Sequence, residues 1–410
     1  MKKTVIIRVL AIVLVGLMVL SVGAGVIMSV NAQDDPNFTI SDGVLTKYNG
    51  TDQNVTIPSA VFYIGDFAFE NNTTLNTVTF AGEVNYIGQG AFSGCTALTA
   101  IYNTQKVTSV GADAFKSTPF LSSMPGDFKT LNKILLQYSG TQQTVTVADG
   151  VNSIAPGAFA GNRTVQTITL PATVAEIGEK AFYGCVSLEN INLPATVTTI
   201  GRFAFEGTSW LSEQSGFVIA GNGILVKYIG DNTNISTPNE VLQIAPSAFE
   251  GSNIQTVRLS GKIYLLGSYA FYNCQNLKSV KFNMAPSVFV DEFAFANCSN
   301  LSILAFYKDS LTSMDSTAIN NSPKTEIFAD SGTLAAEFAN TNGITLNPAA
   351  GDVDSMAGTT IGDATEIQKF LAKLIKEEDF NTKCGDFNCD GKVDIIDVTA
   401  LQKMLAKIDF

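Results

Sequence analysis

The residues whose types and spacing most clearly indicate a binding site lie near the C-terminus, in the stretch GDFNCDGKVDIID at 385–397. Side-chain oxygens alternate along it, and Gly391 at the sixth loop position allows the sharp turn that wraps such oxygens around a cation. Hard oxygen ligands at this spacing predict a calcium site. The predicted ligands, with Lys392 acting through its backbone carbonyl, are Asp386, Asn388, Asp390, Lys392, Asp394 and Asp397.

A second copy of this loop begins 34 residues earlier, in GDVDSMAGTTIGDATEIQKFLAKL. Met356 stands where the later loop has Asp390, and Ala357 stands where it has Gly391. Because a carboxylate and the turning glycine are both missing, we expect this loop to bind calcium weakly or not at all. Its remaining ligands are Asp352, Asp354, Thr360 and Asp363.

Each loop runs into an apolar-faced helix that ends in QKxLAK, and the pair resembles a type I dockerin. The resemblance covers 351–410 and implies a small all-α module of two half EF-hands at 349–410, with Ca²⁺ as its cofactor. It also implies a partner, the cohesin domain of a scaffoldin in a cellulosome. In dockerins, the residues at loop positions 10 and 11 and on the exposed face of the following helix contact this partner. These residues are Ile395, Ile396, Gln402, Lys403, Ile361, Gly362, Gln368 and Lys369.

Two further features of the module bear on its partner and on its cysteines. Ile395 and Ile396 replace the small hydroxyl pair of one well-known dockerin group, so we expect a more apolar cohesin socket. Cys384 and Cys389 flank the later loop at a separation of five, which leaves open a disulfide or two neighbouring thiols.

A long array of repeats precedes the module. The phrase IGDFAF at 64–69 returns in varied form, and its closing residues are Phe69, Phe92, Phe115, Phe159, Phe182, Phe205, Phe249, Phe271 and Phe295. The steps between them are 23, 23, 44, 23, 23, 44, 22 and 24 residues. A fixed short period predicts stacked coils, in which these rings form one continuous buried ladder.

The two long steps contain an inserted segment that also repeats. Tyr48, Tyr138 and Tyr228 lie 90 residues apart and each is followed at two residues by glycine. Duplication of a three-coil unit explains this superperiod. Alternating apolar residues around Asp-Gly and Asn-Gly turns predict a β-hairpin in each insert, and the first one, at 38–58, would cap the open end of the stack.

The coil pattern IGxxAFxGCxxLxxIxLPxxVxx, clearest at 177–199, resembles the BspA-type leucine-rich repeats of bacterial surface proteins. The resemblance implies a solenoid over 33–348, with short parallel strands, short helical turns and inserted β-hairpins. Its repeats span about 59–324. A C-terminal cap at 325–348 would hold a strand, a short helix and a strand-like tail.

Outward strand positions are rich in Thr and Asn and become basic at Arg258 and Lys281. Such a face suits a protein or a glycan, and the alternative is a solvated sheet without a ligand. Four cysteines share one repeat position, Cys95, Cys185, Cys274 and Cys298, and we expect small buried thiols there. An oxidised pair between Cys274 and Cys298 stays open.

Charge and composition exclude several classes of function. The net charge of -12 and the pI of about 4.6 argue against nucleic acid as a partner. The chain contains no histidine, which excludes His-based triads and HExxH zinc sites. Residues 1–32 predict an export signal, with Lys2 and Lys3 before an apolar run and Ala32 before the cleavage site. An uncleaved membrane anchor is the alternative; after cleavage no membrane contact is expected.

These features favour a secreted, extracellular, non-catalytic protein of a cellulosome, an assembly that acts in polysaccharide catabolism. The dockerin would attach the chain to a scaffoldin, and the repeats would be displayed to bind a protein or a glycan. A cell-surface adhesin is the alternative. An enzyme is less favoured because no segment outside the repeats has the length of a catalytic domain, and the acidic residues of the coils, such as Glu70, Glu179 and Glu206, are scattered.

Overall fold

The computed structural model describes residues 36–282, 287–307, 310–349, 361–376, 380, 382–387 and 392–406. The predicted export signal at 1–32 lies outside these residues. Within the described ranges, no helix has the length and apolar character needed to cross a bilayer.

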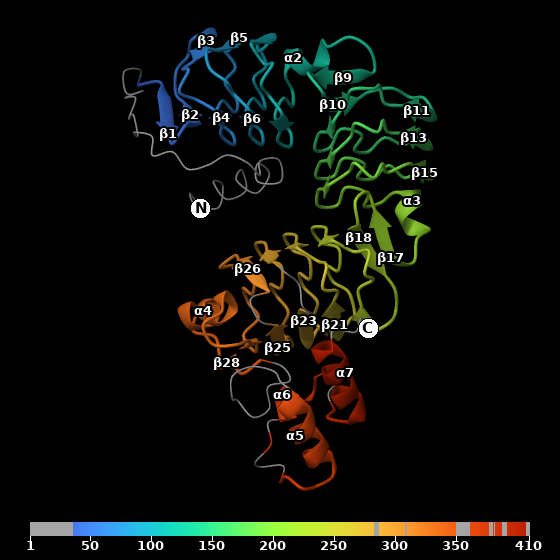
Figure 1. The fold of residues 1–410 in the computed structure, drawn as a ribbon. Coiled ribbons are helices and arrows are strands. Elements are labelled where there is room, and N and C mark those ends of the chain that lie inside the picture. Colours follow the sequence, from blue (N-terminus) through green and yellow to red (C-terminus); the bar gives the residue numbers. More distant parts are fainter. Residues whose placement is uncertain are drawn as a thin grey trace.

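The described chain winds into a solenoid that follows an arc (Figure 1). Each ordinary coil gives one strand to a sheet on the outer side of the arc and one strand to a sheet on the inner side. Partners in these parallel sheets lie one repeat apart, as in Thr167 with Asn190 and Glu176 with Thr199. Residues that are paired in neighbouring strands are therefore separated by the 23-residue period of the sequence.

The sheets are interrupted twice, which divides the solenoid into three blocks. Block 1 (38–122) has inner strands β1 Phe38–Ser41, β2 Val44–Tyr48, β4 Tyr63–Ile64, β6 Tyr86–Ile87 and β8 Ser109–Val110, outer strands β3 Asn54–Ile57, β5 Thr77–Phe80 and β7 Ala100–Tyr102, and helix α2 Pro119–Ser122. Block 2 (128–212) has inner strands β9 Phe128–Leu131, β10 Ile134–Tyr138, β12 Ser153–Ile154, β14 Glu176–Ile177 and β16 Thr199–Ile200, outer strands β11 Thr144–Thr146, β13 Thr167–Thr169 and β15 Asn190–Ile191, and helix α3 Ser209–Ser212.

Block 3 (216–347) is longer and ends in a cap. Its inner strands are β17 Gly216–Ala220, β18 Ile224–Ile229, β20 Gln243–Ile244, β22 Leu265–Leu266, β24 Val288–Val290 and β26 Leu311–Met314. Its outer strands are β19 Asn234–Ser236, β21 Thr256–Leu259, β23 Ser279–Phe282, β25 Ile303–Phe306, β27 Glu326–Phe328 and β28 Leu346–Asn347. Helix α4 Leu334–Thr341 lies between β27 and β28, which is the strand, helix and tail order predicted for 325–348.

Stacked aromatic rings fill the core of each block. Phe159, Phe182 and Phe205 are fully buried, with centroids 5.1 and 5.4 Å apart between neighbours. The Phe182 amide donates a 2.8 Å hydrogen bond to the carbonyl of Ala204 in the next coil, and the same bond joins other Ala-Phe pairs. The alanine therefore allows the close approach of two backbones, and the phenylalanine fills the space beside it.

The prediction of one continuous ladder is wrong, because the stack ends at each block boundary. Phe120 packs on Phe115 at 58° and Trp210 packs on Phe205 at 56°, so each tilted ring closes its stack. The buried residues accordingly form one main cluster per block.

The predicted hairpins are present, and each one starts a new stack. Tyr48 lies on Phe69 with centroids 5.0 Å apart, and Phe38 covers its other side. A Cβ at Gly50 would lie 2.4 Å from the Tyr48 hydroxyl, which explains the glycine two residues after each of these tyrosines. The inserted segments are thus opening coils in which tyrosine takes the place of phenylalanine.

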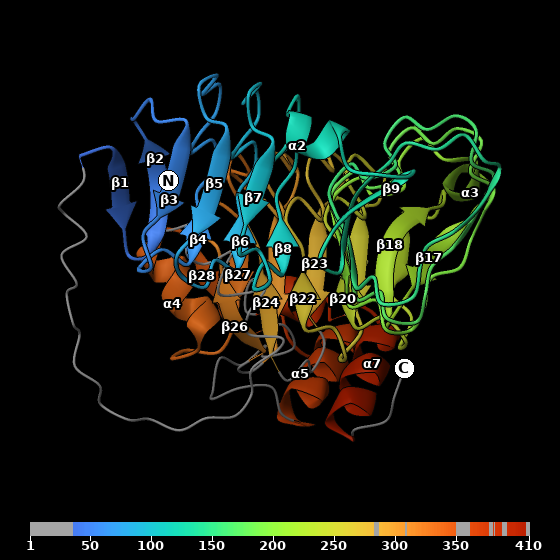
Figure 2. The same ribbon diagram turned by 90° about the horizontal axis from the view of Figure 1, so that it is seen from above.

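Three helices follow the solenoid: α5 Ile361–Leu371, α6 Thr382–Gly385 and α7 Ile395–Leu405. We call residues 349–410 the C-terminal module. Figure 2 shows its helices beside the strands of block 3.

Replacing Phe182 by alanine should lower the free energy of unfolding by about 3–5 kcal/mol, because the substitution empties a rung of the block 2 stack. Denaturant unfolding followed by the fluorescence of Trp210, which lies in the same block, measures the change. The control is Tyr183→Ala, since Tyr183 is 46% exposed and should change stability by less than about 1 kcal/mol. Equal losses for the two variants would contradict the ladder.

Candidate functional site

Two helices of the C-terminal module, α5 and α7, are structural counterparts. Helices α5 and α7 have 11 residues each, and their bounds differ by the 34 residues of the sequence repeat. Matching positions are buried in both helices, namely Asp363 with Asp397, Ala364 with Val398 and Ile367 with Leu401. The two helices pack together around Phe380 and Phe387, so the module has its own apolar core.

The described end of the second loop forms a capping box at the start of α7. The Asp397 side chain is fully buried, and its Oδ2 accepts a 2.8 Å hydrogen bond from the Asp394 amide. Asp394 Oδ1 in turn accepts a 2.7 Å bond from the Ile396 amide. The Asp394 amide supplies a donor that a buried carboxylate needs, and Asp397 also has the residue type and the place of the predicted last calcium ligand.

The remaining predicted ligands are only partly visible. Asp386 is half-buried directly after α6, and Lys392 is exposed. Asn388 and Asp390 lie outside the described residues, as do Asp352, Asp354 and Thr360 of the first loop. Within the described residues no three His, Cys, Asp or Glu side chains converge on one point. The residues present fit the end of a calcium loop, and the complete ligand set stays a prediction.

The residues predicted to read a partner all lie on the surface. Ile361, Ile395 and Ile396 are 63%, 61% and 57% exposed. The other members of the set are also exposed: Gly362, Gln368, Lys369, Gln402 and Lys403. Ile395 and Ile396 are adjacent at the start of α7 and present apolar surface to solvent, which is a feature of protein-binding sites.

The structure describes only one of the two cysteines of the module. Cys384 is fully buried, with its Sγ 3.6 Å from the Pro348 carbonyl oxygen. Cys389 lies outside the described residues, so the disulfide stays a prediction.

The outer strand face of the solenoid is open in blocks 1 and 2 and partly covered in block 3. Tyr102, Thr169, Asn190 and Asn192 are exposed on this face, and Thr77, Thr79 and Thr167 are half-buried. Lys281 differs from the expectation, because only 5% of it is exposed. It lies on the outward side of β23 but the C-terminal module covers it.

The repeats match a known family. A model described as "BspA type Leucine rich repeat region (6 copies)" matches residues 39–139, 129–215 and 227–336, which is more than half of the chain. The chain belongs to the BspA-type leucine-rich repeat family. The helices α5, α6 and α7 lie outside the matched ranges.

Several solved structures resemble this BspA-type chain. A leucine-rich cell surface protein of Faecalibacterium prausnitzii is 25% identical over 74% of this chain and 95% of that one, with a TM-score of 0.30. A leucine-rich repeat protein of Bacteroides ovatus is 24% identical over 69% and 64%, with a TM-score of 0.24. The pneumococcal vaccine antigen PcpA is 13% identical over 77% and 97%, with a TM-score of 0.25. Such low scores carry no argument about function. Among curated proteins there is no match.

A groove of about 720 Å³ separates blocks 1 and 2 of the BspA-type solenoid. Its apolar lining includes Leu121, Leu136 and Pro156, and hydroxyl groups of Thr118 and Ser122 add polar character. The equivalent space between blocks 2 and 3 has a volume of only about 20 Å³. Larger residues occupy it: Phe203, Lys227 and Ser247 replace Asp113, Gln137 and Gly157 of the first junction.

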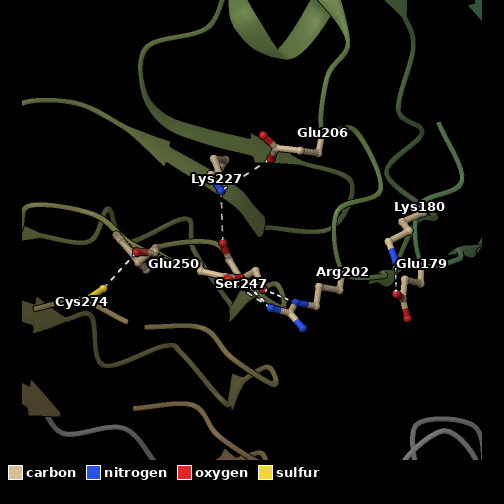
Figure 3. Close-up of polar contacts among 9 residues, drawn as sticks. Glu179, Lys180, Arg202, Glu206, Lys227, Ser247, Glu250 and Cys274 are labelled. Atoms are coloured by element: carbon tan, nitrogen blue, oxygen red, sulfur yellow. Dashed lines mark hydrogen bonds and ion pairs between the residues drawn. The ribbon is translucent and has the colours of Figure 1, made fainter. Parts of the chain in front are cut away.

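The second junction is held by a polar clamp (Figure 3). Arg202 of block 2 donates to both carboxylate oxygens of Glu250 in block 3, at 3.1 and 2.9 Å, and to the Ser247 hydroxyl at 2.7 Å. Its guanidinium lies 3.9 Å from the centroid of the Tyr269 ring. Nη2 makes both bonds to Glu250 and Nε makes the bond to Ser247, and such charge-assisted hydrogen bonds are stronger than bonds between neutral groups.

The four repeat cysteines are buried free thiols, as predicted, and they join neighbouring coils. The Cys95 Sγ donates to the Phe69 carbonyl at 3.0 Å and the Cys185 Sγ donates to that of Phe159 at 3.1 Å. Cys274 and Cys298 make the same contact and do not form a disulfide. Burial raises the pKa of both Cys95 and Cys185 to about 11.

Separating Arg202 from Glu250 should weaken the second junction. The single variants Arg202→Met and Glu250→Gln and their double variant should give a coupling energy of about 1–3 kcal/mol in denaturant unfolding, since both side chains are about three quarters buried. Glu179 and Lys180, about half exposed, form the control pair, and their coupling should be near zero. Equal coupling in both pairs would rule out the clamp.

The thiols Cys95 and Cys185 should stay unreactive in the folded protein. Because their pKa is raised from 9.0 to about 11, they remain protonated at pH 8, and alkylation read by peptide mass spectrometry should mark them only after unfolding. The stabilisation from keeping these thiols neutral is complete below pH 9 and is lost as the pH rises toward 11. Labelling of the native chain as fast as the unfolded chain would refute their burial.

Proposed function

We propose that this chain is an exported, non-catalytic protein whose C-terminal module binds calcium and docks on a cohesin module of a scaffold protein. The BspA-type solenoid is then the cargo that the scaffold displays. The observation that carries the proposal is the agreement between α5 and α7, which bury and expose equivalent residues at a spacing of 34. Such a duplicated loop-and-helix unit is the form expected of a dockerin.

Calcium would hold the second loop through Asp386, Asn388, Asp390, Lys392, Asp394 and Asp397. A bound cation offsets the repulsion between these carboxylates and fixes the loop that leads into α7. In the first loop, Asp352, Asp354, Thr360 and Asp363 would hold it weakly or not at all. Small domains with few core residues commonly depend on such a metal for folding, and the module's core cluster is small.

The exposed isoleucines support a protein partner for the module. Ile395 and Ile396 are exposed at the start of α7, and the polar residues Gln402 and Lys403 are exposed about two turns later on the same helix. An apolar centre with a polar rim is typical of protein interfaces. The partner that would complement these side chains is a cohesin with an apolar socket.

The solenoid is suited to protein binding or adhesion. Its free outer face in blocks 1 and 2 carries Tyr102, Thr169, Asn190 and Asn192, a neutral polar set that suits a glycan or a protein. The chain lacks histidine, which excludes His-based catalysis. A cell-surface adhesin that holds its place without a scaffold is the second candidate, favoured by this same free face.

Capture on immobilised cohesin modules tests the proposal. The full chain should be retained in calcium and released by a chelator, and Asp397→Asn should reduce retention at least tenfold because position 12 loses its charge. Asp363→Asn, the matched change in the weaker copy, should have a smaller effect.

Two outcomes would oppose the proposal. Retention that a chelator does not disturb would remove calcium from the docking step, and binding to cells without any scaffold protein would favour the adhesin. Release of sugars from plant polysaccharides by the purified chain would show an enzyme.

A further inference from the structure

The outer strand face of block 3 changes character along one row of paired residues. Lys281, Ala305 and Phe328 are direct partners on β23, β25 and β27. The corresponding rows of blocks 1 and 2 carry residues such as Thr79 with Tyr102 and Thr146 with Thr169. We call Lys281, Ala305 and Phe328 the seat row. It is buried although it points away from the solenoid core.

The C-terminal module covers the seat row. Ala305 and Phe328 form a buried cluster with Cys384 of α6, and Ile303 packs against it. Tyr307 packs against the module's own core, and the Cys384 Sγ lies 3.6 Å from the Pro348 carbonyl oxygen. The two parts therefore share one apolar interface, which the figures place on the outer side of β23 and β25.

Lys281 connects this interface to the predicted calcium loop. Its ammonium donates to the carbonyl oxygen of Phe387 and lies 3.1 Å from the centroid of the Phe387 ring. Phe387 directly follows Asp386, the first predicted calcium ligand, and its ring is buried in the module core. A buried lysine is stable only with such partners, so its position and that of Phe387 depend on each other.

We propose that calcium binding by the second loop and seating of the module on the row Lys281, Ala305 and Phe328 are coupled, each strengthening the other. This rests on the calcium site of the proposed function. Calcium fixes the backbone around Asp386, and Lys281 holds the carbonyl and the ring of the next residue in place. Both contacts therefore stabilise the same loop conformation, and the coupling is reciprocal.

The seated module keeps its predicted partner surface free. Ile361, Ile395 and Ile396 are all exposed while α6 and Phe387 contact the seat row. A partner bound there would hold the solenoid in a fixed orientation rather than on a loose tether.

Calorimetric titration of the full chain with calcium tests the coupling. Lys281→Met removes the donor and keeps the length of the side chain, and Ala305→Arg places a bulky charge in the interface without touching the loop. Both should weaken the tight calcium event by about fivefold or more. Lys278→Met is the control, because Lys278 is exposed on the same coil and its loss removes the same charge; its affinity should stay within about twofold of the parent.

Hydrogen exchange at saturating calcium is the second measurement. Amides of residues 382–387, which include the bond from the Asp386 amide to the Thr382 carbonyl, should lose protection in both interface variants. Protection of the Phe271 and Phe295 amides, which lie in the same block as the substitutions, reports whether the solenoid itself remains folded.

The outcomes separate the two proposals. If the parent chain shows no calcium binding, the calcium site of the proposed function fails. If it binds calcium and Lys281→Met matches the control or binds more tightly, the coupling is overturned. It is also overturned if Ala305→Arg leaves both calcium affinity and exchange unchanged, because the Lys281 effect is then one of charge alone.

Discussion

Face-to-face packing of aromatic rings between successive coils is the constraint on which this structure depends. Phe249 and Phe271 lie 4.6 Å apart and nearly parallel, and their coils are joined by backbone bonds from phenylalanine to alanine. The glycine after the inner strand accommodates this approach in coils such as the one that contains Gly201, where a Cβ would lie 2.3 Å from the Glu179 amide nitrogen. Periodicity, sheet register and burial all follow from this stacking.

The regular features could be predicted from sequence because equivalent positions of successive repeats occupy the same structural environment. The Phe positions, the hairpins and the buried thiols were found in this way. The breaks in the ladder were missed, because Phe120 and Trp210 occur outside the repeated phrase and their tilt depends on local helices. The burial of Lys281 was missed because the residue that covers it, Phe387, lies 106 residues later in the sequence. The repeat period cannot predict a contact between a repeat and a segment outside the repeats. The replacement of Thr by Ala305 and Phe328 on the outer face was the available signal.

The solenoid and the C-terminal module obtain stability from different sources. The blocks have large apolar clusters, and their coils need no metal to bury them. The module has a small core in which Asp363 and Asp397 are buried beside apolar residues. Carboxylates in such a place favour folding only when donors or a cation offset their desolvation. The proposed division, a metal-independent body with a metal-dependent connector, follows from this difference.

Hydrogen exchange of the full chain, compared in calcium and in a chelator, tests this division most directly. The account predicts that amides of α5 and α7 lose most of their protection in the chelator, while the amides of Phe69, Phe182 and Phe271 keep theirs. Equal protection of α5 and α7 after all divalent metal has been removed would contradict it.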